Sequence, residues 1–229
     1  MWPFKTKQLP AIKKRNYEAA SRSNRLSSWN TYNSDANASA RSLPVIRSRS
    51  RDLVRNNPHA ARIVQTIAGH VVGYGIIGTI KNNPRLDKLW QQWSESTQCD
   101  ADGRHDLYGL QRLVTRCVVE SGECLIRIRP RLAKDGLVVP LQLQVLEPDY
   151  LDNNKNTTLA NGGLIISGVE YDAIGKVVAY WLYSHHPGSA NGRVSFTSNR
   201  IDAKNIIHVF RVDRPGDRKS TRLNSSHRL

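Results

Sequence analysis

Apolar residues recur every three or four positions over much of the first half of the chain, which is the spacing of one face of an α-helix. A basic helix is predicted over Leu43–Arg55, and Asn56–Pro58 then separates it from a second helix. Asparagine can cap the free N–H groups of a helix start, and proline in the first turn loses no intrahelical bond. The stripe predicted to be buried in the second helix consists of Ala60, Ile63, Val64, Ile67, Ala68, Val71 and Val72.

The same signals predict two further helices. Asn82–Pro84 repeats the capping tripeptide and opens a short helix whose apolar face is Leu86, Leu89, Trp90 and Trp93. We expect these tryptophans in the core or in a contact between subunits. Asp106 is predicted to cap the next helix, and Gly122 lies where a left-handed C-terminal residue belongs. The buried stripe of that helix is predicted as Leu107, Leu110, Leu113, Val114, Cys117 and Val118.

Beyond Gly122 the apolar residues alternate with polar ones, which indicates half-buried β-strands. Turns are predicted at Asp135-Gly136 and at Asp172–Gly175, the second as the connection of a hairpin. The predicted strands cover residues 124–129, 141–146, 164–171, 176–183 and 205–212. Helices followed by strands predict an α+β fold with a largely antiparallel sheet, not a doubly wound one.

One glycine-rich segment has the spacing of a nucleotide-binding loop. Gly73–Gly78 is a literal G-x-G-x-x-G. A dinucleotide site needs this turn after a strand and before a helix, because the helix N-terminus must receive the pyrophosphate. Here a helix precedes the glycines, so we predict a helix-terminating loop and assign no cofactor.

The acidic residues Asp100, Asp102 and Asp106 have a spacing that resembles a calcium-binding loop, but the segment lacks other features of such a loop. Gly103 falls too early and no glutamate closes the loop, so an acidic turn that caps the next helix is predicted.

The remaining candidates for chemistry are weak. His185-His186 is predicted to lie in a loop, and Glu120 and Glu123 are interpreted as solvated residues at a helix end. Cys99, Cys117 and Cys124 form no C-x-x-C pair and are expected as free thiols. We predict no metal ligand and no catalytic residue, and therefore no enzyme.

The charge is concentrated at the ends of the chain. Residues 1–64 carry 13 Lys/Arg against 3 acidic residues, residues 65–216 carry 17 against 15, and residues 217–229 carry 4 against 1. No apolar run reaches the roughly 18–20 residues that span a bilayer, so a soluble protein without a membrane partner is predicted. A basic arm, disordered on its own, is expected over residues 1–42, ahead of a nearly neutral domain over residues 43–216.

The basic residues within residues 1–64, which we call the basic leader, are the one feature of the sequence that consistently indicates a binding chemistry. Lysine and arginine release counterions when they meet phosphates, and no base-reading motif accompanies them. Contacts with a nucleic-acid backbone or with a protein partner are therefore predicted, without sequence specificity, for Lys13, Lys14, Arg15, Arg22, Arg25, Arg47, Arg49 and Arg51.

A collinear series of short segments resembles a known family from about Tyr17 to Gly216. The segments are 40–41, 48–58, 60–62, 71–76, 99–103, 108–111, 119–123, 142–147, 168–172, 208–210 and 214–216. Each segment is weak alone, but their order resembles that of the lambda-type portal proteins of tailed phages.

This resemblance implies a structural subunit of a dodecameric ring, the head–tail connector at one capsid vertex. DNA would be packaged and ejected through the ring, which nucleates the shell and docks terminase, capsid and head-completion proteins. The virion would be its final location, after assembly in the cytoplasm of the bacterial host. This part of the chain resembles the peripheral wing of family members, which continue beyond it into a channel-lining stem, clip and crown. No catalytic residue is implied.

The last thirteen residues differ in kind from the rest. Asp217–His227 resembles the translation of a short-read sequencing adapter, so we expect Asp217–Leu229 not to be native phage protein.

Two other classes of function stay open at this point. A small basic nucleic-acid-binding module would use residues 43–72 as a helical reader, and would expose a basic helix. A cofactor-binding enzyme would need a strand ahead of Gly73.

Overall fold

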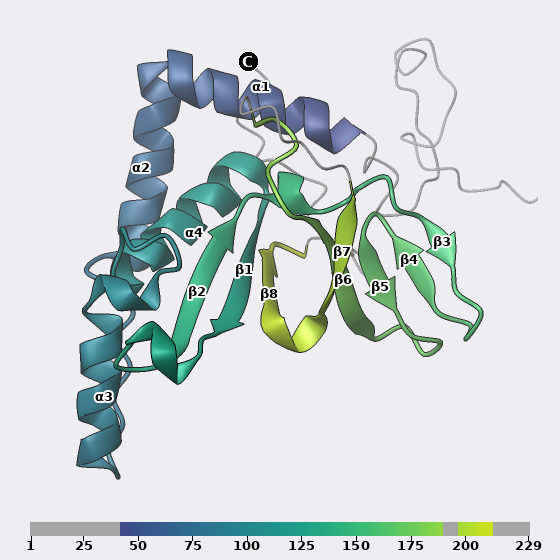
Figure 1. The fold of residues 1–229 in the computed structure, drawn as a ribbon. Helices are drawn as coiled ribbons and strands as arrows, with labels where there is room; N and C mark the ends of the chain where they lie inside the picture. Colours follow the sequence, from purple (N-terminus) through teal and green to yellow (C-terminus); the bar gives the residue numbers. More distant parts are fainter. Residues whose placement is uncertain (1–41, 190–196, 213–229) are drawn as a thin grey trace, which may run out of the picture. The chain divides into compact units, whose positions relative to one another are not determined.

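The computed structural model describes residues 42–189 and 197–212. Within these residues, four helices come first: α1 (Leu43–Asn56), α2 (Pro58–Val72), α3 (Pro84–Ser94) and α4 (Leu107–Ser121). Eight strands follow in the same described ranges: β1 (Glu123–Pro130), β2 (Leu141–Leu146), β3 (Thr157–Thr158), β4 (Leu164–Ile166), β5 (Val169–Tyr171), β6 (Val177–Tyr183), β7 (Ser198–Asp202) and β8 (Ile206–Phe210). The predicted α+β class, with helices ahead of antiparallel strands, is confirmed (Figure 1).

The helix boundaries follow the capping residues predicted from sequence. The Asn57 side chain accepts hydrogen bonds from the N–H groups of His59 and Ala60, and Asn83 accepts one from Leu86 at 3.0 Å. Asp106 accepts one from Gly109 at 2.7 Å. At the other end of α4, Gly122 takes the left-handed conformation, with φ 87° and ψ −25°.

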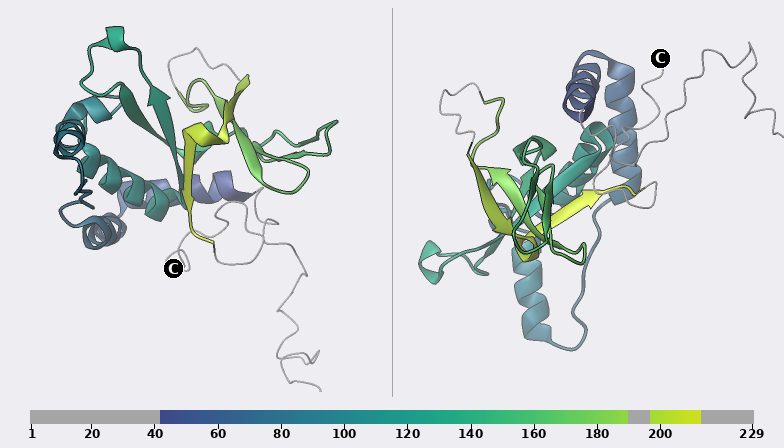
Figure 2. Two further views of the ribbon diagram at one scale, coloured as in Figure 1. Left: turned by 90° about the horizontal axis from the view of Figure 1, so that it is seen from below. Right: turned by 90° about the vertical axis from the view of Figure 1, so that its right-hand side faces the viewer.

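The strands form two sheets rather than the single sheet predicted. One has the order β2-β1-β8 and the other β3-β4-β5-β6-β7, with antiparallel pairing between all neighbours. In Figure 1, α2, α3 and α4 lie on one side of the three-stranded sheet and the five-stranded sheet lies on the other, and α1 runs across the top; Figure 2 gives the view from below. The first sheet is therefore a middle layer.

Two apolar cores join these layers. Between the sheets, eight buried residues pack together: Leu125, Leu146, Leu151, Val169, Tyr171, Tyr180, Leu182 and Ile206. On the helical side, Trp93, Cys99 and Leu110 pack with partly buried residues that include Leu141, Leu143 and Val145 of β2. The Trp93 Nε1–H donates to the Leu141 carbonyl at 2.7 Å, which satisfies the polar end of a buried ring.

Three predictions about elements were wrong. Residues 164–171 form two strands, because Ser167 and Gly168 both have positive φ and reverse the chain between β4 and β5. Strands β3 and β7 were not predicted. In α2 only Val64, Ala68 and Val72 of the expected stripe are fully buried, whereas Ile63 and Val71 are about half exposed.

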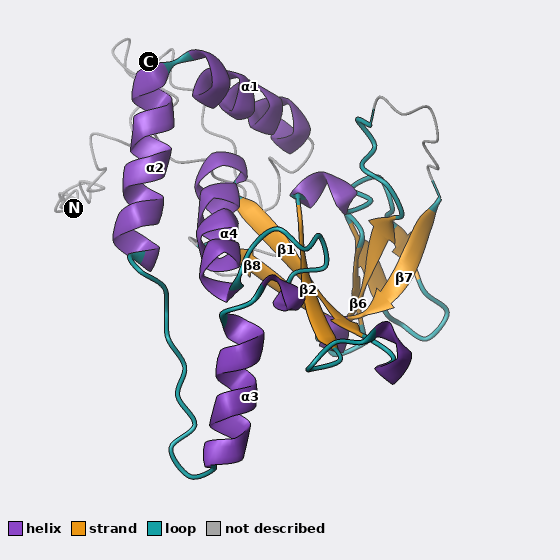
Figure 3. Ribbon diagram, turned by 60° about the vertical axis from the view of Figure 1, so that its left-hand side comes forward, coloured by secondary structure: helices purple, strands orange, loops and turns teal. Residues whose placement is uncertain are grey.

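The segment 73–83 connects α2 to α3 and follows a helix, not a strand (Figure 3). The Gln111 side chain of α4 holds it in place, accepting from the Ile76 N–H at 2.7 Å and donating to the Ile76 carbonyl at 3.0 Å. Upstream of α4, the Asp100 carboxylate accepts from the N–H groups of Asp102, Arg104 and His105, which makes the acidic segment a closed turn. Among the described helices, none is long and apolar enough to cross a membrane.

Candidate partner interface around helix α1

Helix α1 is held against the protein by polar side chains. Leu43, Arg47 and Ser50 lie on one helix face and are each no more than 2% exposed. The Ser50 hydroxyl donates to the Glu120 carbonyl at 2.6 Å, and Arg47 Nε donates to the Ser121 carbonyl at 3.1 Å. The last carbonyls of a helix have no intrahelical partner and favour positive charge. The C-terminal turn of α4 therefore offers a favourable binding position for the Arg47 side chain of α1.

Arg47 also forms the first link of a buried chain of polar contacts. Its Nη2 pairs with Glu123 Oε1, and Glu123 Oε2 lies 2.8 Å from His208 Nε2. The three side chains are 1%, 0% and 4% exposed. They come from α1, β1 and β8, so one carboxylate joins the first helix to two strands far apart in sequence.

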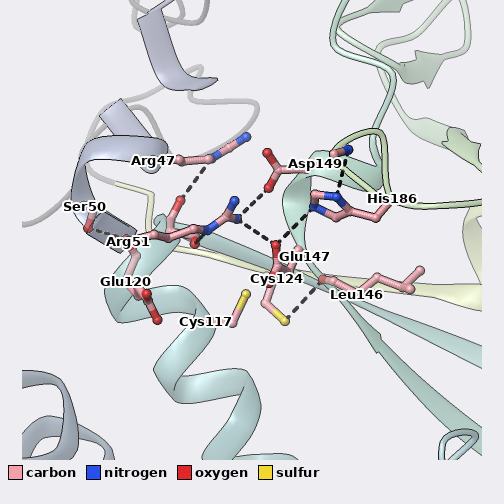
Figure 4. A network of polar contacts seen from close by, with 12 residues as sticks. Arg47, Ser50, Arg51, Cys117, Glu120, Cys124, Leu146, Glu147, Asp149 and His186 are labelled. Atoms are coloured by element: carbon pink, nitrogen blue, oxygen red, sulfur yellow. Dashed lines mark hydrogen bonds and ion pairs between the residues drawn. The ribbon is translucent and has the colours of Figure 1, made fainter. Parts of the chain in front are cut away.

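Arg51, one turn further along α1, reaches a second acidic group (Figure 4). Its Nη2 lies 2.5 Å from Asp149 Oδ2 and 3.2 Å from Glu147 Oε2. Burial lowers the pKa of Arg51, but the hydrogen bond and negative charge of Asp149 raise it by more, so the net shift is upward. The guanidinium therefore stays charged and neutralises both carboxylates.

The same acidic pair, together with His186, has the donor atoms of a metal site. Single ligand atoms of Glu147, Asp149 and His186 lie within 4.8 Å of one another. Arg51 Nη2 is within 3.2 Å of both carboxylates and already brings positive charge to the place a cation would take. The residues present fit an ion-pair network better than a metal centre.

A groove of about 580 Å³ runs beside this network, between α1, α2, α4 and β2. Val54, Leu113 and Val145 contribute apolar side chains to it, and Arg55, Arg116 and Glu120 contribute charge. Burial raises the pKa of Glu120, although neighbouring arginines act in the opposite direction. Such a mixed groove suits contact with a protein surface.

The structure divides the residues predicted to contact a nucleic acid or a partner. Arg49 is exposed on the outer side of α1, and Arg51 is partly buried in its ion pairs. Arg47 requires a correction: it is 1% exposed and bonded within the protein, so it has no free surface for a phosphate. The predicted residues Lys13, Lys14, Arg15, Arg22 and Arg25 lie outside the described part of the chain.

Sequence reasoning missed the acidic partners. Glu123 was interpreted as a solvated helix-end residue, but it is fully buried as the first residue of β1. The spacing of Leu43, Arg47 and Ser50 could have indicated the pair, because it places Arg47 on the buried face of a helix. A buried arginine needs an acidic partner. The spacing does not indicate which acidic residue pairs with this arginine.

The cysteines form free thiols, as predicted. Cys117 of α4 and Cys124 of β1 lie close together beneath the Arg51 network (Figure 4). A hydrogen bond between these two side chains, together with burial, raises the pKa of the Cys117 thiol. A thiol held protonated in this way is a packing group rather than a nucleophile.

Three comparisons with known proteins bear on this arrangement. The family model for phage portal proteins of the lambda family matches residues 22–221. A probable portal protein of Halomonas phage phiHAP-1 is 30% identical over 185 residues, which cover 75% of this chain and 35% of the relative. Among solved structures, a chain from the neck of an empty GTA particle, computed with C6 symmetry, is similar with a TM-score of 0.44 and 18% identity. That similarity covers 73% of this chain and 38% of the other, so the chain spans little more than a third of each of these two proteins.

Proposed function

This chain belongs to the lambda family of phage portal proteins, and from that premise we propose that it forms the outer part of a portal ring subunit. The observation that carries the proposal is the family match over residues 22–221, which includes every helix and strand of the structure. The role is structural: the ring is the head–tail connector through which DNA is packaged and ejected. No catalytic step is assigned to the chain.

The proposed partners follow from this role. Copies of the chain assemble into a closed ring, with twelve subunits as the expected number. Double-stranded DNA is contacted through its phosphates without reading of bases, because most of the net positive charge lies in residues 1–64 and no base-reading motif accompanies it. Terminase, capsid and head-completion proteins dock on the ring at the portal vertex of the virion, after assembly in the host cytoplasm.

The structure gives reasons to prefer this role over a small nucleic-acid-binding module. Such a module would use residues 43–72 as a basic reading helix, but the Arg47 and Arg51 side chains are engaged inside the protein. Over the described residues, the enzyme alternative also lacks a strand before Gly73, because α2 precedes it.

Negative-stain electron microscopy of the product of the complete open reading frame tests the proposal. We expect rings with a central channel, built from copies of the chain. A product that sediments as a monomer over the micromolar range and shows no rings would contradict the proposal.

We also propose that residues 43–216 are one domain and that Asp217–Leu229, outside the described residues, is an adapter-derived tail. Independent amplification and sequencing of the gene tests this. A continuous gene that encodes the tail would contradict it.

A further inference from the structure

Three arginines lie on one face of β1 and of the residue that follows it. Arg127, Arg129 and Arg131 occupy alternate positions, and alternate side chains of an extended chain share a face. The N–H of Arg131 pairs with the Pro140 carbonyl at 2.9 Å, so the pairing with the neighbouring chain continues past the end of β1. The three side chains therefore start about 6.6 Å apart, which is two residues of an extended chain. We call them the arginine ladder.

The polar neighbours of the ladder on β2 are neutral amides. Arg129 Nη1 donates to Gln144 Oε1 at 3.2 Å, and Arg131 Nε donates to Gln142 Oε1 at 2.7 Å. An amide oxygen accepts a hydrogen bond but carries no net charge. These bonds therefore hold two of the guanidiniums in place without neutralising them.

The ladder has no acidic partner among the described residues. Over residues 42–189 and 197–212, the arginines that form ion pairs with carboxylates are Arg47, Arg51 and Arg200. Burial lowers the pKa of Arg127, and the positive charges of Arg129 and Arg131 lower it further. Partly buried charges of one sign that lie together are unfavourable unless an opposite charge joins them. Such a cluster is typical of a site whose ligand supplies that charge.

We propose that the arginine ladder binds an extended acidic segment of a partner protein. Carboxylates at alternate positions of such a segment repeat at the same spacing of about 6.6 Å, so they meet successive guanidiniums. A guanidinium and a carboxylate form two parallel hydrogen bonds, which gives the contact its specificity. The proposed site goes beyond the ring, because it belongs to a single copy of the chain.

A protein segment fits the ladder better than a DNA duplex. The three arginines are each partly buried on the face of a sheet, so a narrow extended chain can lie along them. The wider cylinder of a duplex meets protruding side chains first. The connection between β1 and β2 projects from the other strands in both views of Figure 2, which leaves the ladder open to a partner from its Arg131 end.

Fluorescence anisotropy with a labelled peptide and the full chain tests the site. The probe is the peptide (Thr-Glu)₄, which carries carboxylates at alternate positions, and (Thr-Gln)₄ is its neutral counterpart. The ladder variant is Arg127→Gln with Arg129→Gln and Arg131→Gln. We expect it to raise the dissociation constant of (Thr-Glu)₄ about ten-fold or more.

The matched control removes the same positive charge from exposed positions elsewhere, through Lys88→Gln, Arg104→Gln and Lys176→Gln. We expect it to change the dissociation constant less than about two-fold, because distant exposed charges are screened. Circular dichroism shows whether each variant keeps the fold.

Three results would overturn the inference. The first is no binding of (Thr-Glu)₄ to the unaltered chain at about 1 mM peptide. The second is an equal loss in the ladder variant and the control, which would indicate general attraction to a basic protein. The third is a labelled DNA duplex that binds more tightly than (Thr-Glu)₄ and loses its affinity in the ladder variant, which would assign the ladder to nucleic acid.

Thermal unfolding of one single variant gives an independent measurement. The Arg127 guanidinium forms no hydrogen bond or ion pair with the other described residues, so Arg127→Met removes its charge and keeps most of its aliphatic length. We expect the melting temperature to rise by about 2 °C, because the repulsion from Arg129 and Arg131 is relieved. A lower melting temperature would show that this arginine stabilises the fold, and would overturn the inference.

Discussion

At the scale of single residues, the least expected feature is a basic helix attached through its arginines. Arg47 occupies a place on the buried face of α1 that an apolar residue would normally hold, with Leu43 one turn before it. The buried arginine is stabilised because its guanidinium pairs with Glu123 and donates to the Ser121 carbonyl at the end of α4. Burying either charge alone would be strongly unfavourable.

We therefore predict that Arg47→Met destabilises the protein by about 3–5 kcal/mol, because Glu123 loses its cationic partner while it stays buried. Urea unfolding followed by circular dichroism measures the change. The matched control Arg49→Met removes an exposed arginine from the same helix and should change the free energy of unfolding by less than about 0.5 kcal/mol.

A second variant makes this prediction sharper. Arg47→Met combined with Glu123→Gln removes both charges, so the double variant should be more stable than Arg47→Met alone. If the changes in the free energy of unfolding caused by the two substitutions were simply additive, Arg47 and Glu123 would not be coupled. The argument that this pair holds α1 against the protein would then fail.

At the scale of elements, the turn that divides residues 164–171 into two strands lies in close contact with the backbone of Asp152. Gly168 has φ 79°, and a Cβ on it would lie 2.7 Å from the Asp152 carbonyl oxygen. Its N–H donates to the Lys155 carbonyl and its carbonyl accepts from Trp181, so the backbone has little room to move away. The β4–β5 turn is thus packed against the rest of the sheet.

Gly168→Ala should be much more destabilising than Gly175→Ala. Both glycines have positive φ, so each alanine incurs the strain of the left-handed conformation, about 1–2 kcal/mol. Only position 168 adds a collision with backbone, because nothing lies within 4 Å of a Cβ at position 175. Thermal unfolding of the two variants provides the comparison, and equal melting temperatures would contradict the packing described for β4 and β5.

At the scale of the whole molecule, charge is divided between a basic leader and a nearly neutral body. Residues 65–216 carry 17 basic and 15 acidic residues, and within the described part of this range Arg200 pairs with Glu170 and Asp202. A body of this kind can pack against copies of itself, and we propose that residues 1–64 supply the contacts with DNA phosphates.

This division predicts where the salt dependence of DNA binding arises. Replacement of Lys13, Lys14, Arg15, Arg22 and Arg25 by serine should reduce the slope of log K against log salt by about 0.9 for each DNA phosphate that the leader no longer neutralises. Fluorescence anisotropy with a labelled duplex at several salt concentrations measures the slope. Serine at five exposed basic positions of the body, Arg104, Arg116, Lys134, Lys176 and Lys204, is the control. A larger reduction of the slope in the control would place the DNA-binding surface on the body instead.

The sequence by itself determined the order of the four helices, the change from helices to strands, and the residues that cap the helices. Asn57, Asn83 and Asp106 cap helices in the structure because capping is local: a side chain bonds N–H groups two or three residues away. The α+β class followed from the change in apolar period at Gly122 for the same reason. The family resemblance was also visible at this level, because it depends on the order of short segments.

Only the tertiary structure decided which side chains are buried and which are partners. Part of the α2 stripe is exposed because α4 covers only the side that carries Val64, Ala68 and Val72, and amphipathic spacing does not state how wide the covering element is. Glu123 pairs with Arg47 across 76 positions, and no local pattern specifies so distant a partner. The separation into two sheets likewise depends on strand pairing over long distances, which is set by packing rather than by the alternation within each strand.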